Sequence, residues 1–135
     1  MKFLKASNLY TLNRSTYVKL RWIAYIGQLI AILSVQFLLN FNFNYFICIS
    51  IILISVFTNL YLQFKVKENQ LNNFLSTLYL SYDILQLGIL FFLTGGITNP
   101  FIFLIIIPAV FSSQYLNIYS SILLSFLIIL ILAFL

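Results

Sequence analysis

Long continuous apolar runs, separated by short polar stretches, make up most of the chain from residue 22 onward. A helix needs about 20 residues to cross the hydrocarbon core of a bilayer, and most of these runs have that length. Membrane β-barrel strands are shorter and alternate polar with apolar residues, so the continuous runs exclude them. The pattern predicts an all-α, polytopic transmembrane helical bundle. Its helices are expected over residues 22–39, 46–64, 74–93, 100–114 and 118–135.

Composition and charge support this class. Of the 135 residues, 63% are hydrophobic and 7% are charged, whereas roughly a quarter of a soluble domain is charged. The basic residues gather before residue 22 and in the stretch around Lys65 and Lys67. Because loops rich in Lys and Arg stay in the cytoplasm, residues 1–21 are predicted to be a cytoplasmic juxtamembrane segment, and residues 22–135 a transmembrane domain. The positive charge therefore indicates membrane orientation and not nucleic-acid binding.

Several classes of chemistry are excluded by what the chain does not contain. It has no histidine and a single cysteine, Cys48. A histidine metal site, a histidine proton relay, a phospho-accepting histidine and an internal disulfide are therefore all impossible within it. No nucleophile–base pair or lysine-bearing phosphate loop is visible either. We expect no catalytic residues and no metal, and we interpret Cys48 as a small apolar filler.

The stretch Gly95–Phe101 is where turn-forming residues concentrate. Two adjacent glycines permit positive φ angles, Asn99 is a favoured helix N-cap, and Pro100 is tolerated at the first helical position. The stretch is uncharged and, by alternation of the spans, lies on the outer side of the membrane. A plain tight connection between helices would use the same residues. The alternative is a contact site for a flat, lipid-soluble ligand, to which backbone N–H groups and the Asn99 amide donate while Phe101 packs on the ring.

Polar residues inside the predicted spans form a second candidate site. Tyr79, Asp83 and Gln86 share one face of the third helix, together with Ser76. An acid near the bilayer centre costs about 2.5–3.5 kcal/mol on insertion scales, so Asp83 is expected to have a role. Gln28 of the first helix lies at similar depth and is its expected partner. A structural interhelical hydrogen bond and a signalling role both remain open for Asp83.

Three further residues have expected structural roles. Arg21 and Trp22 are predicted to anchor the first helix at the membrane interface, where Trp is enriched. Pro108 is predicted to kink the fourth helix.

Three stretches, in chain order, resemble one family. These are Lys19–Ala24 with Gly27 and Gln28, then Tyr82–Leu87, and then Gly95–Phe101, which matches the heptapeptide GGxxNPF. The chain resembles the RegB/PrrB redox-sensing histidine kinases over roughly residues 15 to 115. The resemblance implies a six-helix sensor domain in the bacterial inner membrane, of which this chain holds about five helices. It also implies a heptapeptide associated with ubiquinone sensing, so the expected quinone contacts are Gly95, Gly96, Asn99, Pro100 and Phe101.

The resemblance further implies a homodimer, a cytoplasmic ATP-dependent histidine kinase module and a response regulator as partner. None of the kinase residues lies in this chain, and Cys48 is not equated with the redox-active cysteine of the family. The chain ends within an apolar run, so we expect it to be part of a longer protein. Two other functions remain as alternatives: a fragment of a small-molecule transporter, and a plain membrane anchor.

Overall fold

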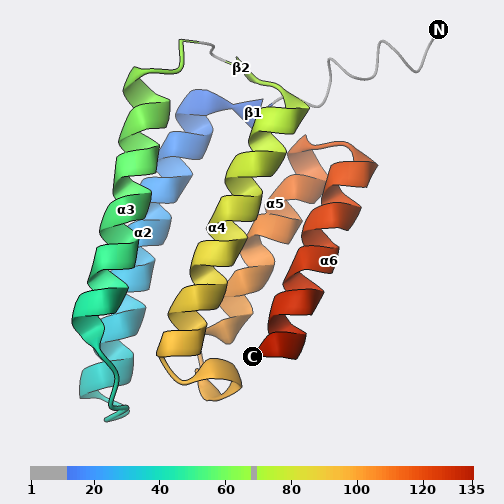
Figure 1. Cartoon of the computed structure of the whole chain (residues 1–135). Helices are drawn as coiled ribbons and strands as arrows, with labels where there is room; N and C mark the ends of the chain where they lie inside the picture. Colours follow the sequence, from blue (N-terminus) through green and yellow to red (C-terminus); the bar gives the residue numbers. More distant parts are fainter. Residues whose placement is uncertain (1–11, 68–69) are drawn as a thin grey trace, which may run out of the picture.

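The computed structural model describes residues 12–67 and 70–135. Five α-helices make up most of this part of the chain, as Figure 1 shows. They are α2 (Arg14–Phe37), α3 (Tyr45–Phe64), α4 (Asn73–Leu93), α5 (Ile107–Tyr115) and α6 (Ile118–Phe134). Two 3-10 helices, η2 (Gly96–Thr98) and η3 (Ile102–Ile106), connect α4 to α5. The predicted all-α class is confirmed.

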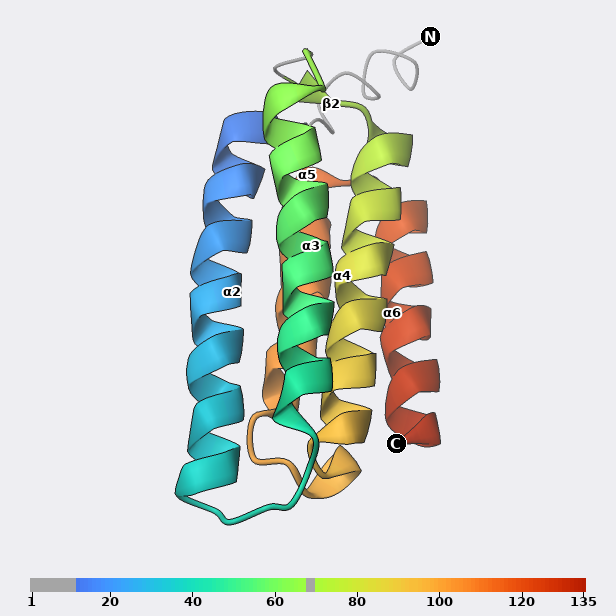
Figure 2. The ribbon, with the colours of Figure 1, turned by 60° about the vertical axis from the view of Figure 1, so that its left-hand side comes forward.

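The helices run up and down beside one another, and α4 lies between the other pairs (Figures 1 and 2). Helix α2 packs mainly on α3, whereas α4 contacts α3, α5 and α6. Two short strands, β1 (Leu12–Asn13) and β2 (Gln70–Leu71), pair antiparallel with Leu12 opposite Leu71. Because β1 leads into α2 and β2 leads into α4, the first turns of these two parallel helices are held at the same level.

Four of the helices have an asparagine as their N-cap residue. Asn13, Asn44, Asn72 and Asn117 each accept a hydrogen bond from a backbone N–H in the first turn that follows. This satisfies one of the N–H groups that a helix start leaves unpaired. The cap at Asn13 explains why α2 begins at Arg14, eight residues before the start predicted for the first membrane span. The last part of the expected juxtamembrane segment, residues 14–21, is helical, while residues 1–11 lie outside the described residues.

The fourth helix also differs from the prediction of one helix over residues 100–114. Pro100 lies in a turn, the chain then forms the 3-10 helix η3, and α5 starts only at Ile107. Pro108 lies in the first turn of α5 and does not kink a longer helix. Since proline lacks the N–H that an α-helical bond to residue 104 requires, the segment before it adopts the tighter 3-10 pattern instead.

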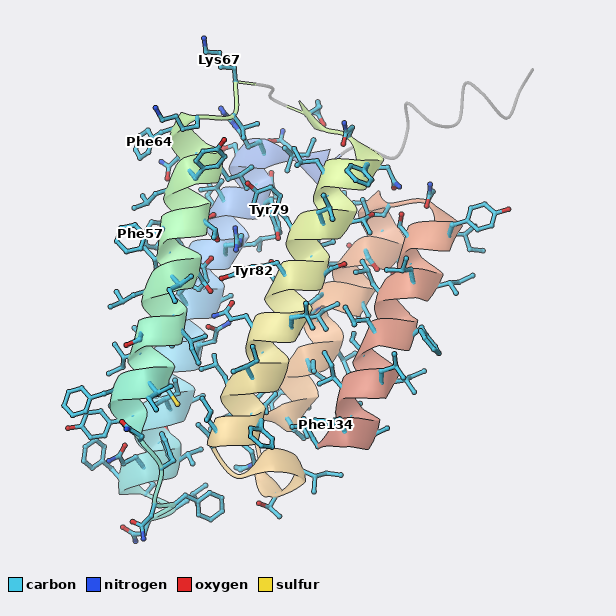
Figure 3. All side chains as sticks on the ribbon, viewed as in Figure 1. Phe57, Phe64, Lys67, Tyr79, Tyr82 and Phe134 are labelled. Atoms are coloured by element: carbon cyan, nitrogen blue, oxygen red, sulfur yellow. The ribbon has the colours of Figure 1, made fainter. Side chains whose placement is uncertain are left out.

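Three helices are long and apolar enough to cross a membrane: Arg14–Phe37, Tyr45–Phe64 and Asn73–Leu93. The segments Ile102–Tyr115 and Ile118–Phe134 are apolar but shorter. Large hydrophobic side chains such as Phe57, Phe64 and Phe134 point outward (Figure 3) and are 70%, 73% and 78% exposed. An apolar outer surface of this kind suits lipid, and the helices satisfy their own backbone groups.

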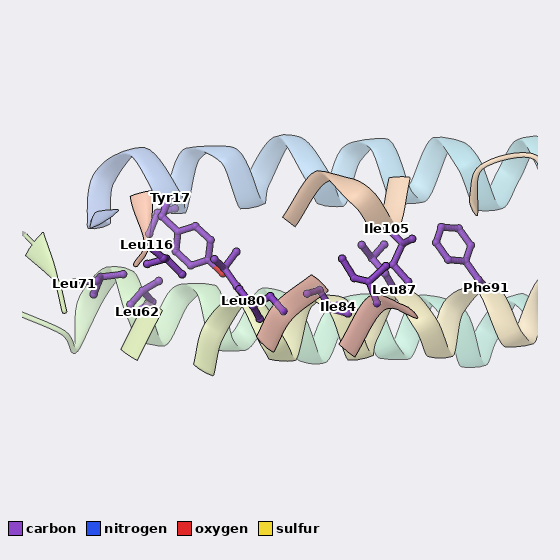
Figure 4. Packing of buried hydrophobic residues seen from close by; sticks show 12 residues of the cluster. Tyr17, Leu62, Leu71, Leu80, Ile84, Leu87, Phe91, Ile105 and Leu116 are labelled. Atoms are coloured by element: carbon purple, nitrogen blue, oxygen red, sulfur yellow. The ribbon is translucent and has the colours of Figure 1, made fainter. Parts of the chain in front are cut away.

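The core follows α4. Its side chains Leu80, Ile84, Leu87 and Phe91 are buried at successive turns and meet residues from the other helices (Figure 4). Ile105 of η3 reaches this row from one side. Helix α4 therefore supplies one face to the core and a different face, with Asp83 and Gln86, to α2.

Candidate functional site

A buried ion pair joins α2 to α4. Arg21 Nη2 lies 2.9 Å from Asp83 Oδ1, and the two side chains are 3% and 16% exposed. The hydroxyl of Tyr17, one turn before Arg21, donates a hydrogen bond to the other oxygen of Asp83. The prediction that Gln28 is the partner of Asp83 was therefore wrong. The acid is held by a cation and a phenol from the first two turns of α2.

The guanidinium of Arg21 lies inside a cage of tyrosines. Its central carbon is 5.5 Å from the ring centres of Tyr17 and Tyr79 and 5.7 Å from that of Tyr25. These distances are typical of cation–π contacts. Nη2 also donates to Thr58 of α3 at 3.0 Å. Arg21 is thus packed in the bundle, whereas its neighbour Trp22, set edge-on to Tyr25, is 37% exposed.

Two nitrogens of the same guanidinium have no acceptor. Nε and Nη1 of Arg21 are buried and make no hydrogen bond within the described residues. Buried polar groups without a partner are uncommon in folded proteins, and they often mark a ligand or a bound water. The donors of Arg21 are therefore only partly used by the protein.

Hydrogen bonds extend this cluster into α3. Thr58 donates to the backbone oxygen of Ser55 at 2.7 Å, and the Tyr25 hydroxyl donates to the same oxygen at 2.9 Å. The Ser55 hydroxyl lies 3.1 Å from the hydroxyl of Tyr82 on α4. Tyr79 and Tyr82 point from α4 toward α2 and α3 (Figure 3). The network therefore links α2, α3 and α4 at one depth.

A second polar pair lies further along the same two helices. Gln86 Nε2 donates to Gln28 Oε1 at 3.0 Å, and both residues are buried. Like Arg21 and Asp83, these residues connect α2 to α4. The polar residues predicted to share one face of the third helix thus contact α2 in two places. Asp83 forms the ion pair with Arg21, and Gln86 forms the amide hydrogen bond with Gln28.

A groove of about 370 Å³ runs beside these contacts. Helix α2 forms one wall, η3 and α5 form the other, and α4 forms the floor. Its polar lining includes Arg21, Asp83, Gln28 and Gln86, and the rest is largely aromatic or aliphatic. A smaller cavity of about 20 Å³ shares Gln28, Leu87 and Leu104 with the groove and reaches Thr94 and Asn99. The groove thus lies beside the ion pair, and the small cavity next to it lies under Asn99 of the Gly95–Phe101 loop.

The Gly95–Phe101 loop itself has an internally bonded structure. Gly95 and Gly96 have φ angles of +113° and +61°, which explains the need for glycine at the first position. The Asn99 amide donates to both Thr94 Oγ1 (2.7 Å) and the Thr94 backbone oxygen (3.2 Å), and its oxygen accepts from Phe101 N. The buried Asn99 side chain therefore holds the loop together, and its amide is not exposed at the outer surface.

The remaining loop residues differ in exposure. Gly95 and Pro100 are exposed, Gly96 is half-buried, and the half-buried Phe101 ring packs against the main core. No backbone hydrogen bond within the described residues starts from the N–H of Gly95 or Gly96. The loop thus offers backbone donors at its turn, while its side chains serve mostly to hold it closed.

Arg21 is the site residue whose place was not predicted from sequence. The signal was present, because Tyr17 and Arg21 are one helical turn apart and lie on one face once the helix is known to begin at Arg14. As for chemistry, no group of three or more metal-ligating side chains occurs in the described part of the chain. What the arrangement provides is an ion-paired guanidinium with two unused N–H groups beside a largely apolar groove.

Comparisons with known proteins identify a relative. No protein-family model matches the chain, and no solved structure matches it. The sensor histidine kinase RegB of Cereibacter sphaeroides is 36% identical over 110 residues, which are 81% of this chain and 24% of the relative. The chain thus spans about a quarter of the length of the curated protein that it matches. This similarity favours a sensor over a transporter fragment or a plain anchor. Over these residues, the chain belongs to the family of RegB-type sensor histidine kinases, as a multi-pass membrane segment.

Proposed function

We propose that the chain is the membrane-embedded input domain of a two-component sensor histidine kinase, and that it responds to the redox state of ubiquinone. The match to RegB over 81% of the chain carries this proposal. In the proposed scheme, the domain passes quinone state to a cytoplasmic kinase module outside this chain. That kinase transfers phosphate to a response regulator, and the protein acts as a homodimer.

Two features of the structure support a lipid-soluble ligand. The first is the groove between α2 and α5, which has room for a small ring compound and has few polar groups. The second is the loop, whose Gly95 and Gly96 N–H groups have no backbone acceptor in the described structure. In this proposal Gly95, Gly96, Pro100 and Phe101 form the loop part of the quinone site. Asn99 keeps that part in shape through its bonds to Thr94.

The charge distribution supports a cytoplasmic N-terminus. Arg14, Lys65 and Lys67 lie at the same end of the bundle as β1 and β2 (Figure 1). Among the described residues, none at the opposite end, which carries the Asn40–Asn44 and Gly95–Phe101 loops, is charged. Because basic loops are retained in the cytoplasm, we place the first end inside and the heptapeptide outside. A kinase module would then connect at the cytoplasmic side.

The α2–α4 contacts offer a route for the signal. Asp83, Gln28 and Gln86 line the groove and bond across the α2–α4 interface, so a ligand that displaces either helix alters their bonds. The ring of Tyr79 lies against the guanidinium of Arg21 and would be moved with it. In the proposal they respond to the ligand and also hold the bundle together. Rearranged contacts at packed helix interfaces are a common means of switching between states.

The test is a chimera in which this chain replaces the matching 110-residue segment of the RegB relative, so that the relative's own sequence leads on to its kinase module, and the chimera is reconstituted in proteoliposomes. Autophosphorylation is measured without quinone, with oxidised ubiquinone and with reduced ubiquinone. We expect the rate to differ between the two redox forms, and Asn99→Asp or Pro100→Leu to alter that difference while membrane insertion is retained. Equal phosphorylation under all three conditions, in a chimera that is active and inserted, would contradict the proposed function.

A further inference from the structure

We infer that the quinone ring lies in the groove between α2 and α5, with one carbonyl oxygen directed at Arg21, and not on the outer face of the heptapeptide loop. The inference rests on the proposed function for the identity of the ligand. It goes beyond that function in naming the site and the donor. The loop then contributes indirectly, because Asn99 lines the small cavity that shares Gln28, Leu87 and Leu104 with the groove.

The donor argument starts from Arg21. Its side chain is 3% exposed and lines the groove, yet Nε and Nη1 have no acceptor among the described residues. Asp83 and Thr58 both bind Nη2, so the charge is paired while two N–H directions remain unused. A neutral molecule that carries acceptor oxygens suits such a site better than an anion, because Asp83 already balances the charge. A quinone carbonyl has this chemistry.

A second donor lies further along the groove. Gln28 accepts from Gln86 through Oε1, and its Nε2 makes no hydrogen bond within the described structure. Gln28 lines both the groove and the small cavity under Asn99. Two donors therefore lie on one wall, about two helical turns apart along α2, and a molecule with an oxygen at each end of a ring can use both.

The shape and the opening of the groove also suit a quinone that enters from the bilayer. Its volume of about 370 Å³ lies within the range of about 300–1,000 Å³ that is usual for small-molecule sites. Tyr17, Tyr25 and Phe111 give it aromatic walls. The rims are formed by Ile23 and Ile107, which are 66% and 57% exposed, so the groove opens sideways toward lipid. A ligand dissolved in the bilayer can enter without crossing the loops.

Gly27 provides a specific way to block this site. It lines the groove, and a Cβ atom placed on it would meet no heavy atom within 4 Å. The Cβ of a leucine at this position therefore meets no clash, and its remaining atoms take up space in the groove. Replacing glycine inside a helix also favours the helix, so Gly27→Leu should fold and insert. The matched control is Ala133→Leu, which adds similar bulk at an exposed position of α6 that does not line the groove.

The experiment uses a photoactivatable azido-ubiquinone on the protein in phospholipid nanodiscs, with ubiquinone-1 as competitor and mass spectrometry to map the labelled peptides. We expect saturable, competed labelling of α2 between Tyr17 and Gln28 and of the segment Leu104–Phe111. Gly27→Leu should weaken the apparent affinity roughly tenfold or more, equivalent to about 1.4 kcal/mol. Ala133→Leu should leave it unchanged.

The outcomes separate the inference from the proposed function. Saturable labelling that maps to Gly95–Phe101, or that Gly27→Leu leaves unchanged, overturns the groove site while quinone sensing stands. Groove labelling that excess ubiquinone-1 does not compete shows a lipid-filled groove and also overturns the site. If the wild-type protein shows no saturable labelling anywhere, both the proposed function and the inference fall.

Discussion

Removing the charge of Asp83 tests the buried ion pair directly. The substitution Asp83→Leu leaves Arg21, which is 3% exposed, with a buried charge and no counterion. Breaking a buried pair in this way costs about 3–5 kcal/mol. The Tyr17 hydroxyl also loses its acceptor, which adds about 1–3 kcal/mol if no other partner is found. We therefore expect Asp83→Leu to lower the free energy of unfolding by at least about 3 kcal/mol.

The double substitution Arg21→Met with Asp83→Leu separates the cost of an orphaned charge from the value of the pair. Replacing both members of a buried pair by apolar residues is often neutral or stabilising. The double variant should thus be more stable than Asp83→Leu alone by about 2 kcal/mol or more. A positive coupling of this kind cannot arise from general loss of packing, because the double variant changes more side chains than the single one.

The assay is reversible unfolding in mixed detergent micelles, followed by circular dichroism, for the wild type and each variant. Tyr17→Phe serves as a graded arm, with an expected loss of about 1 kcal/mol from one hydrogen bond. Its control is Tyr119→Phe, the same chemical change at a side chain that is 81% exposed, which should have no effect. If Asp83→Leu stays within about 0.5 kcal/mol of the wild type, the ion pair does not hold α2 to α4, and this reasoning is refuted.

Three further predictions concern other contacts. Gly95→Ala should destabilise the loop by about 1–3 kcal/mol, because φ is +113° and the new Cβ would lie 3.1 Å from the Phe41 ring. The expected result is faster amide hydrogen exchange at residues 94–101, and unchanged exchange would contradict the prediction. Gly88→Ala would bring Cβ to 2.8 Å from Ile131 Cγ2 and should cost about 1–3 kcal/mol in unfolding free energy, with rescue by Ile131→Ala as the check. Gln28→Leu should cost about 0.6 kcal/mol by leaving the Gln86 donor unpaired, and adding Gln86→Leu should restore the thermal midpoint.

Helices α3 and α4 were predictable because each is a long, mostly apolar run with polar residues at both ends. The predicted spans 46–64 and 74–93 agree within one residue with α3 and α4. The start of α2 was missed because its first turns carry Arg14, Lys19 and Arg21, which look like an aqueous segment when only hydropathy is considered. In the fold, the first turns instead bury Tyr17 and Arg21 against α4, so tertiary pairing, together with the Asn13 cap, extends the helix beyond the apolar run.

The candidate site was predictable only in part, because the start of α2 was misplaced. Asp83 stood out because a lone acid in a span needs a partner, but its partner depends on the level at which α2 begins. If the helix is taken to begin at residue 22, Arg21 lies outside it, and Gln28 is the polar residue of α2 closest in depth to Asp83. The groove was not predictable, because it depends on how far α5 stands from α2, and nothing local in the sequence sets that distance.

The register of α2 against α4 links the two polar pairs into one unit. The β1–β2 pairing sets Leu12 opposite Leu71, so the two helices start level and run in the same direction. Arg21 then reaches Asp83 with its long side chain, and Gln28, two turns further along α2, meets Gln86, which is three residues after Asp83 on α4. Because the rise is 1.5 Å per residue, an axial shift of one helix by a single turn would break both pairs together. Members of both pairs line the groove, so a ligand bound there would act on both contacts at once.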